Sequence, residues 1–218
     1  MTLDLIHEPA GGMVVLPAET ISQRETDHRV ANSLQLISSL LSVQAKHASD
    51  DSVRDALVTA IHRIGAVGAV HKQLHHARSP NSIDIASYLF DLAEAIEQTF
   101  CGGIGRKHIS AHIQGRMVSA DFASVLGILV TELVTNACKH AYAPDESGDI
   151  EICLFFPALS AFRMEVRDYG GQPDDHLASR PPGLGTSIID AMCCKLNATY
   201  AYVLDEEGTR FVTNGRVL

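Results

Sequence analysis

His28 and Asn32, two polar residues one helical turn apart, are the first candidates for chemistry. On a helix with about 100° per residue they fall within about 40° of each other, and the apolar residues of this segment lie on the opposite side. A neutral imidazole that faces solvent can act as a nucleophile, and either Asp27 or Glu25 could accept a proton from its ring. The Asn32 amide could position a water against a phosphorylated imidazole. The simpler interpretation is an ordinary exposed histidine on a polar helix face.

A second set of polar residues lies on an apolar helix expected over residues 121–142. Its members, Glu132, Asn136, Lys139 and His140, all project to one side of that helix. One carboxylate, one amide and two cations on one face suit a triphosphate bound with Mg²⁺. The amide oxygen is a ligand that Mg²⁺ accepts, and the cations can meet phosphate oxygens. The simpler interpretation is an amphipathic helix whose polar face meets solvent.

Two glycine-containing segments could approach a nucleotide. A predicted strand ends at Asp168 and is followed by Gly170. Such an aspartate can accept a hydrogen bond from an exocyclic amine such as that of adenine, and the glycine lets the backbone approach the base. Further on, Gly183, Leu184 and Gly185 open a helix, where backbone N–H groups and the helix dipole favour a phosphate. By itself, each cluster is more typical of a plain turn.

The histidine lies in a segment with the periodicity of a helical hairpin. Over residues 21–78, apolar side chains recur with alternating spacings of four and three, which indicates two heptad helices. Asp50-Asp51-Ser52 separates them and supplies an N-cap for the second helix. The first helix has its seam at Val30, Leu34, Ile37 and Leu41. Because a hairpin cannot bury a continuous seam alone, we predict a homodimer joined through a four-helix bundle.

The rest of the chain has a mixed α/β pattern. A linker is expected at residues 78–82. Helices are expected over 85–100, 121–142 and 183–196, and strands over 108–113, 150–156, 162–167, 198–203 and 209–213. The predicted fold class is therefore α+β. A leader at residues 1–20 precedes an antiparallel helical hairpin over 21–78, and an α/β sandwich over 83–218 covers a mixed sheet with helices.

Composition excludes several classes of protein. The chain has 17 Lys and Arg against 26 Asp and Glu, a net charge of −9, which argues against a nucleic-acid or anionic-membrane binder. No apolar run approaches the ~20 residues that a membrane-spanning helix needs, so no membrane segment is expected. Five cysteines without a C-x-x-C pair indicate reduced thiols and a cytoplasmic location.

In this order, the motifs resemble those of two-component histidine kinases, most closely the HWE-like branch. Residues 27–35 resemble the phosphoacceptor box of that branch, and residues 63–71 its second helix. Residues 132–142 resemble the N box of the GHKL ATPase fold, and residues 208–211 its closing strand motif. Asp168 with Gly170 resembles the first glycine box, and residues 183–185 the second.

The resemblance implies a role for each matching residue. His28 would accept a phosphoryl group from Mg-ATP and pass it to an aspartate on a response-regulator receiver domain. Asp27, Asn32 and Glu132 would complete the catalytic set, and Asn136 would bind Mg²⁺. The nucleotide would meet Asn136, Lys139, His140, Asp168, Gly170, Gly183, Leu184, Gly185 and Thr209. Because no sensor domain is evident, input would come from a separate protein.

Two other functions remain open. Tyr169 stands where the family has asparagine after the adenine-binding aspartate, and the glycine spacing that follows is compressed. These departures motivate a histidine phosphotransferase whose vestigial GHKL-like domain binds no ATP. A third hypothesis is a binding module that sequesters a partner through its helices; it predicts full activity for His28→Ala.

Overall fold

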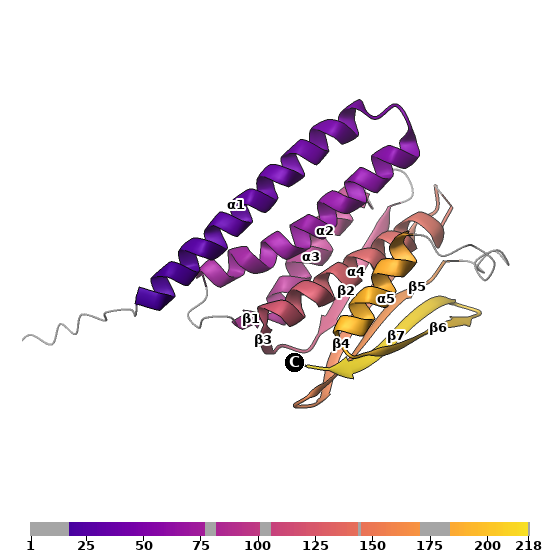
Figure 1. Cartoon of the computed structure of the whole chain (residues 1–218). Helices are drawn as coiled ribbons and strands as arrows, with labels where there is room; N and C mark the ends of the chain where they lie inside the picture. Colours follow the sequence, from indigo (N-terminus) through magenta and orange to yellow (C-terminus); the bar gives the residue numbers. More distant parts are fainter. Residues whose placement is uncertain (1–17, 77–81, 101–105, 144, 171–183, 218) are drawn as a thin grey trace, which may run out of the picture.

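A helical hairpin lies against a larger α/β layer structure in the computed structural model, which describes residues 18–76, 82–100, 106–143, 145–170 and 184–217 (Figure 1). The hairpin consists of α1 (Ala18–His47) and α2 (Asp51–His76). The backbone N–H of Ser52 donates to Asp50 Oδ1 at 2.8 Å, which confirms the predicted cap at the start of α2. The expected leader and linker fall largely outside the described residues.

The second hairpin helix, α2, packs against α1 on one side and against the α/β structure on the other. Gly68 lies opposite Leu34 of α1, and a Cβ atom on this glycine would lie 3.9 Å from the Leu34 Cβ. Ala66 and Val70 are fully buried in the core that α2 shares with the rest of the chain. Figure 1 accordingly shows α2 between α1 and α4. The periodicity predicted the first of these contacts and not the second.

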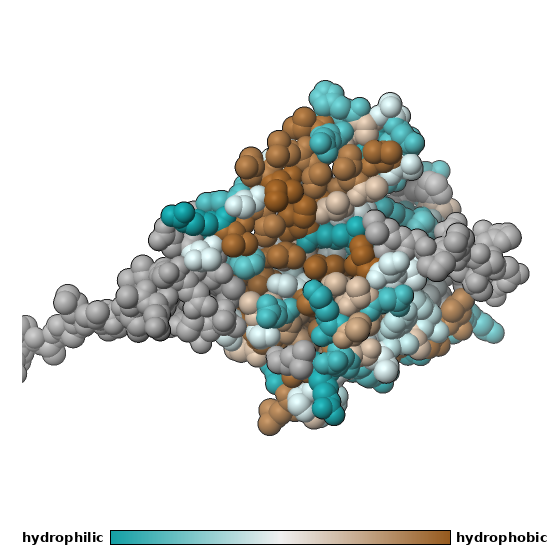
Figure 2. Space-filling view, viewed as in Figure 1, coloured by the Kyte–Doolittle hydropathy of each residue, from teal (hydrophilic) through white to brown (hydrophobic). Residues whose placement is uncertain are grey.

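The first hairpin helix leaves an apolar stripe uncovered. Leu36, Leu40 and Val43 are 63%, 59% and 55% exposed, and Ile37, predicted to be in the buried seam, is 45% exposed. The predicted seam was not expected to be buried by one hairpin alone, so the exposure of Ile37 in this single chain leaves that prediction open; α2 covers a neighbouring sector of α1. Figure 2 shows the resulting hydrophobic surface along the hairpin. We refer to Leu36, Leu40 and Val43 as the α1 stripe.

A five-stranded mixed sheet forms one layer of the α/β structure. Its order is β2 (Lys107–Ile113), β4 (Gly148–Ala158), β5 (Ala161–Asp168), β7 (Gly208–Arg216) and β6 (Thr199–Asp205). Only β2 and β4 are parallel neighbours; the other pairs are antiparallel. The predicted strands are all present. A two-stranded sheet of β1 (Ser82–Asp84) and β3 (Met117–Ser119) was not predicted, because three residues are too few to show a period of two.

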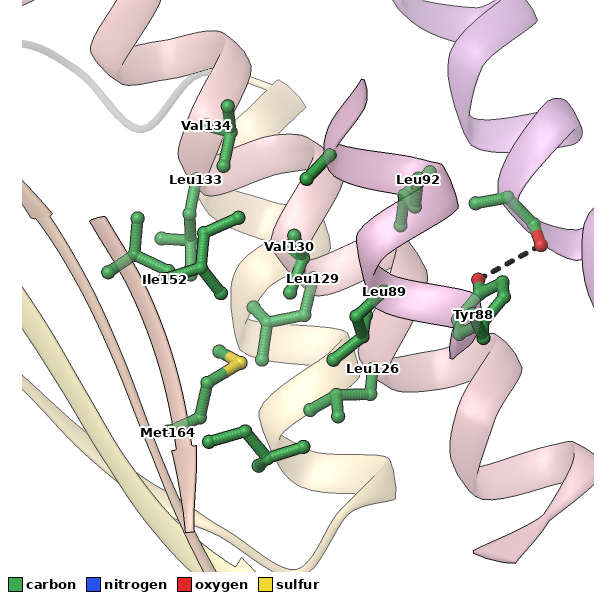
Figure 3. Close-up of a cluster of buried hydrophobic side chains, with 14 of the residues drawn as sticks. Tyr88, Leu89, Leu92, Leu126, Leu129, Val130, Leu133, Val134, Ile152 and Met164 are labelled. Carbon is green, nitrogen blue, oxygen red and sulfur yellow. Dashed lines mark hydrogen bonds between the residues drawn. The ribbon is translucent and has the colours of Figure 1, made fainter. Parts of the chain in front are cut away.

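Three helices belong to this layer structure: α3 (Ile85–Phe100), α4 (Ala120–His140) and α5 (Leu184–Lys195). Their apolar faces share one core with the inward residues of the strands, such as Ile152 and Met164 (Figure 3). In β4 and β5, buried residues alternate with partly or fully exposed ones, so one sheet face packs in the core and the other is open. The predicted fold class is confirmed for the hairpin and for the mixed sheet covered by helices.

Helix α4 is the central element of the core. Its N-cap is Ser119, whose hydroxyl accepts from the N–H of Phe122 at 3.2 Å, and not Asp121 as the sequence predicted. The hydroxyl of Ser119 is placed to cap because β3 ends there. Within the described residues, α4 alone has the length and apolar composition of a membrane span, and 67% of that stretch is buried inside the fold. That burial is typical of a core helix.

Candidate functional site

The polar face of α4 meets the beginning of α5. A Cβ atom on Gly185 would lie 3.4 Å from Glu132 Oε2 and 3.7 Å from both amide atoms of Asn136. Glycine keeps this space open at the first turn of α5, where backbone N–H groups lack helical partners. The structure therefore brings together the predicted residues of α4 and of the second glycine motif. Gly183 lies outside the described residues, and Leu184 is described by its backbone alone.

A second group of predicted residues gathers around the carboxylate of Asp168. Its Oδ1 accepts hydrogen bonds from the backbone N–H groups of Thr209 and Gly170, each at 3.3 Å. Burial raises the pKa of Asp168, and these two hydrogen bonds partly offset that rise. Thr209 is thus positioned through its main chain, at the start of β7. The paired strands β5 and β7 fix both residues at the same edge of the sheet.

Close backbone contacts join this carboxylate group to the end of α4. A Cβ atom on Gly170 would stand 1.8 Å from the carbonyl oxygen of Ala141, the C-cap of α4. Gly208 has a φ of +141°, and a Cβ there would lie 2.2 Å from the Asp168 carbonyl oxygen. The neighbouring Tyr142 hydroxyl accepts from the Tyr169 N–H at 2.8 Å. The glycines are therefore required by packing.

The two groups lie at different levels of one helix. Asn136 and Gly185 mark the middle of the polar face of α4, and Gly170 touches its end at Ala141. Five residues of helix separate those levels, about 7.5 Å at 1.5 Å per residue. An elongated molecule with a base at one end and phosphates at the other could meet both. Lys139 and His140, also on this helix, are exposed residues.

Two residues of the hairpin join this face, and neither was predicted to belong to the site. Arg63 of α2 donates to both carboxylate oxygens of Glu132, with Nη2 at 2.6 Å from Oε2. The Lys139 ammonium donates to Thr59 Oγ1, one turn away on α2, at 2.9 Å. The spacing of Thr59 and Arg63 places them on one helix face, but a helix pattern does not tell which distant helix that face meets.

The histidine helix is not part of this cluster. His28 and Asp27 lie on α1, and their side chains are outside the described part of the chain; Asn32 is an exposed residue of the same helix. Of the hairpin helices, α2 makes the extensive contact with α4, and α1 packs on α2. The structure therefore brings together the residues that were predicted to bind a nucleotide. The helix that contains the predicted phosphoacceptor lies apart from them.

Comparison with known families identifies the class of protein. A family model described as histidine kinase matches residues 25–100, and a model described as histidine kinase-like ATPase domain matches residues 105–209. The chain belongs to the histidine kinase family. The family predicted from the motifs is therefore confirmed. The first match extends past the hairpin over α3, and the predicted domain boundary at residues 78–83 stays a prediction.

Relatives with curated names are sensor kinases. The sensor histidine kinase PdtaS of Mycolicibacterium smegmatis is 30% identical over 177 residues, 76% of this chain and 33% of the relative. Blue-light-activated histidine kinase 2 of Erythrobacter litoralis is 27% identical over 181 residues, 80% of this chain and 51% of the relative. The chain thus spans between a third and a half of the length of these relatives.

A solved structure shares the fold of nearly the whole chain. The histidine kinase domain of the Erythrobacter litoralis EL346 blue-light activated histidine kinase superposes with a TM-score of 0.66. The comparison covers 92% of this chain and 95% of that one, at 20% identity. At this identity the likeness concerns the fold alone.

Proposed function

We propose that the chain is the core of a protein histidine kinase that uses Mg-ATP to phosphorylate His28 and passes the phosphoryl group to a receiver-domain aspartate. The observation that carries the proposal is the convergence along α4 of Asn136, Gly185 and the Asp168 group. These residues are tens of positions apart in the sequence. Along α4 they provide one end suited to a base, at Asp168, and one end suited to phosphates, at Asn136 and Gly185.

The base of the nucleotide fits the Asp168 end. The carboxylate has one oxygen held by two backbone N–H groups and can accept from the adenine amine with the rest of its capacity. Gly170, whose missing Cβ leaves room for the Ala141 carbonyl oxygen, holds the Asp168 end of the site against the end of α4. The phosphates would lie toward the first turn of α5, where N–H groups and the helix dipole stabilise negative charge. Lys139 and His140 would contribute from α4.

The residues at the phosphate end fit Mg²⁺. The amide of Asn136 lies beside the open space at Gly185, and its oxygen is a hard ligand of the kind Mg²⁺ prefers. The described residues contain no group of three His, Cys, Asp or Glu side chains that could hold a metal by themselves. The nucleotide phosphates would therefore supply the remaining ligands. When bound, Mg²⁺ neutralises charge on the phosphates.

The chemical step is an in-line transfer to a ring nitrogen of His28. The lone pair of that nitrogen forms a bond to the γ-phosphorus, the bond from phosphorus to the β,γ-bridging oxygen breaks, and ADP leaves. The second ring nitrogen gives its proton to a carboxylate, for which Asp27 and Glu132 are the candidates. Asn32, one turn beyond His28, would position a water whose oxygen bonds to phosphorus as the N–P bond of phosphohistidine breaks, which releases inorganic phosphate.

The chain would act as a homodimer through the hairpin. The α1 stripe is an exposed apolar face of the kind that a four-helix bundle buries. The free thiols of the described cysteines fit the reducing cytoplasm, where ATP and receiver domains meet.

The phosphotransferase alternative is less well supported, because the Asp168 carboxylate, its backbone donors and the Asn136–Gly185 contact are all in place. The experiment that tests the proposal is a two-stage transfer. The chain is incubated with radiolabelled Mg-ATP, freed of nucleotide, and mixed with receiver domains and their Asp→Asn variants. We expect label to move to the receiver aspartate. Label that reaches the chain only from phosphorylated receivers would instead establish the phosphotransferase.

A further inference from the structure

A buried ion pair connects the hairpin to the ATPase-like domain. Glu132 of α4 is 1% exposed and Arg63 of α2 is 19% exposed. Both carboxylate oxygens accept from the guanidinium, so the pair is bidentate. Because an isolated carboxylate is costly to bury, Arg63 supplies the hydrogen-bonded, oppositely charged partner that a buried Glu132 side chain requires.

Other contacts extend the same interface in both directions along α2. Toward the N-terminus of α2, Thr59 accepts from the Lys139 ammonium at 2.9 Å. Toward its C-terminus, the Tyr88 hydroxyl donates to the Ala66 carbonyl at 2.9 Å (Figure 3). Tyr88 also packs on α4, where a Cβ atom on Gly127 would stand 1.8 Å from its hydroxyl oxygen. The interface is therefore a specific docked arrangement.

This docking holds Glu132 far from the predicted phosphoacceptor. Leu34 of α1 is level with Gly68 of α2, so the antiparallel register places the His28 backbone near the level of Leu74. Arg63 lies eleven positions before Leu74, which corresponds to about 16 Å along α2. In addition, α2 lies between α1 and α4 (Figure 1). The docked domain therefore does not face His28.

We propose that Arg63 and Thr59 form an interdomain latch, which holds the ATPase-like domain in a resting position and must open before His28 is phosphorylated. The proposal rests on the proposed kinase function. Glu132, a candidate proton acceptor, and Lys139, a residue assigned to the nucleotide site, are both held by α2 in this state. A nucleotide that recruits Lys139 competes with Thr59, so opening of the latch and nucleotide binding favour each other.

The test uses Arg63→Gln and Thr59→Val, alone and combined, in the 218-residue chain. Arg163→Gln is the matched control, because it removes another arginine–glutamate pair (Arg163 Nε to Glu165 Oε1, 2.7 Å) on the open face of the sheet. Hydrogen exchange, followed by mass spectrometry, reports docking without requiring kinase activity. We expect faster exchange over residues 59–70 in the latch variants and unchanged exchange in β4 and β5.

Two functional measurements complete the test. In the double variant we expect Mg-ATP to bind about threefold more tightly and His28 to be labelled at least about fivefold faster. Unchanged exchange in the latch variants would overturn the proposal, as would faster exchange with a labelling rate equal to or below that of the unmodified chain. If every variant binds ATP and none labels His28, the kinase proposal fails, and the exchange data alone decide whether the latch exists.

Discussion

Asp168 and Thr209 are joined by a hydrogen bond from the Thr209 N–H to the Asp168 carboxylate at 3.3 Å, although they lie on separate strands. The β5–β7 register sets Asp168 opposite Thr209, and Gly208 provides the positive φ that the tight approach requires. The adenine-recognition role proposed for Asp168 thus depends on strand pairing as much as on the aspartate itself.

Replacing this carboxylate should weaken nucleotide binding. Asp168→Asn keeps an oxygen for the Thr209 N–H but loses the negative charge and presents an amide N–H₂ toward the adenine amine. A hydrogen bond to a charged group contributes about 1.5–3 kcal/mol, so we expect the Kd for Mg-ATP to rise by about tenfold or more. Calorimetric titration measures it, with exposed Asp145→Asn as the control. An affinity within twofold of the unmodified chain would contradict the role.

Two helical glycines should respond in opposite directions to the same substitution. Gly65 is exposed on α2 with nothing within 4 Å of its Cβ position, so Gly65→Ala should stabilise the fold by about 0.5–1 kcal/mol. At Gly127 the new methyl group collides with Tyr88 and displaces its hydrogen bond to Ala66, so Gly127→Ala should destabilise by about 1–3 kcal/mol. Denaturant unfolding distinguishes them, and equal effects would contradict the packing of Tyr88.

The interface between α2 and α4 should weaken at acidic pH. Burial, and then the nearby charge of Lys139, lower the pKa of His62 below 6.5. Above pH 6.5 the imidazole is neutral in both folded and unfolded chains. As the pH falls below 6.5, the unfolded chain binds the proton first, so stability is progressively lost down to the lowered pKa. Arg63, Lys139 and Glu132 are the charged groups of this interface.

Thermal unfolding between pH 8 and 5.5 measures this effect. The Tm of the unmodified chain should fall more steeply below pH 6.5 than that of His62→Gln. Exposed His47→Gln serves as the control and should follow the unmodified chain. Parallel curves for all three proteins would show that His62 does not titrate against the folded state.

Charge placed in the α1 stripe should separate the proposed dimer. Leu40 is 59% exposed in the single chain, so Leu40→Glu costs the monomer little, while it would bury an unpaired carboxylate in a bundle. We expect the mass from light scattering to fall from that of two chains to that of one. Ser39→Glu, on the neighbouring polar sector, is the control. An unmodified chain that is already monomeric at micromolar concentration would contradict the dimer.

Periodicity predicted the long elements well because each has one clear face. The helix expected over residues 85–100 has those bounds in the structure, and every expected strand is present. It did not predict which helix the second face of α2 would meet, because that depends on tertiary packing. Thr59 and Arg63 were therefore missed as partners of α4, although their spacing already placed them on one face.

For the site, as for the fold, the sequence indicated the local motifs but not their long-range partners. The types and order of Asn136, Asp168 and Gly185 indicated a nucleotide, and the structure brings these elements together along α4. The ion pair between Glu132 and Arg63 could not be inferred, because a pair between residues 69 positions apart leaves no local pattern. Ser119 replaced Asp121 as the cap for a related reason, since the unpredicted short strand β3 sets where α4 begins.

The central claim is that His28 accepts a phosphoryl group from ATP. Intact-protein mass spectrometry, at neutral to alkaline pH after incubation with Mg-ATP, tests it most directly beside a His28→Ala control. We expect one added phosphoryl group that is lost in acid and absent from the control. A chain that binds Mg-ATP, contains the latch-opening Arg63→Gln substitution and still gains no mass at His28 would contradict it.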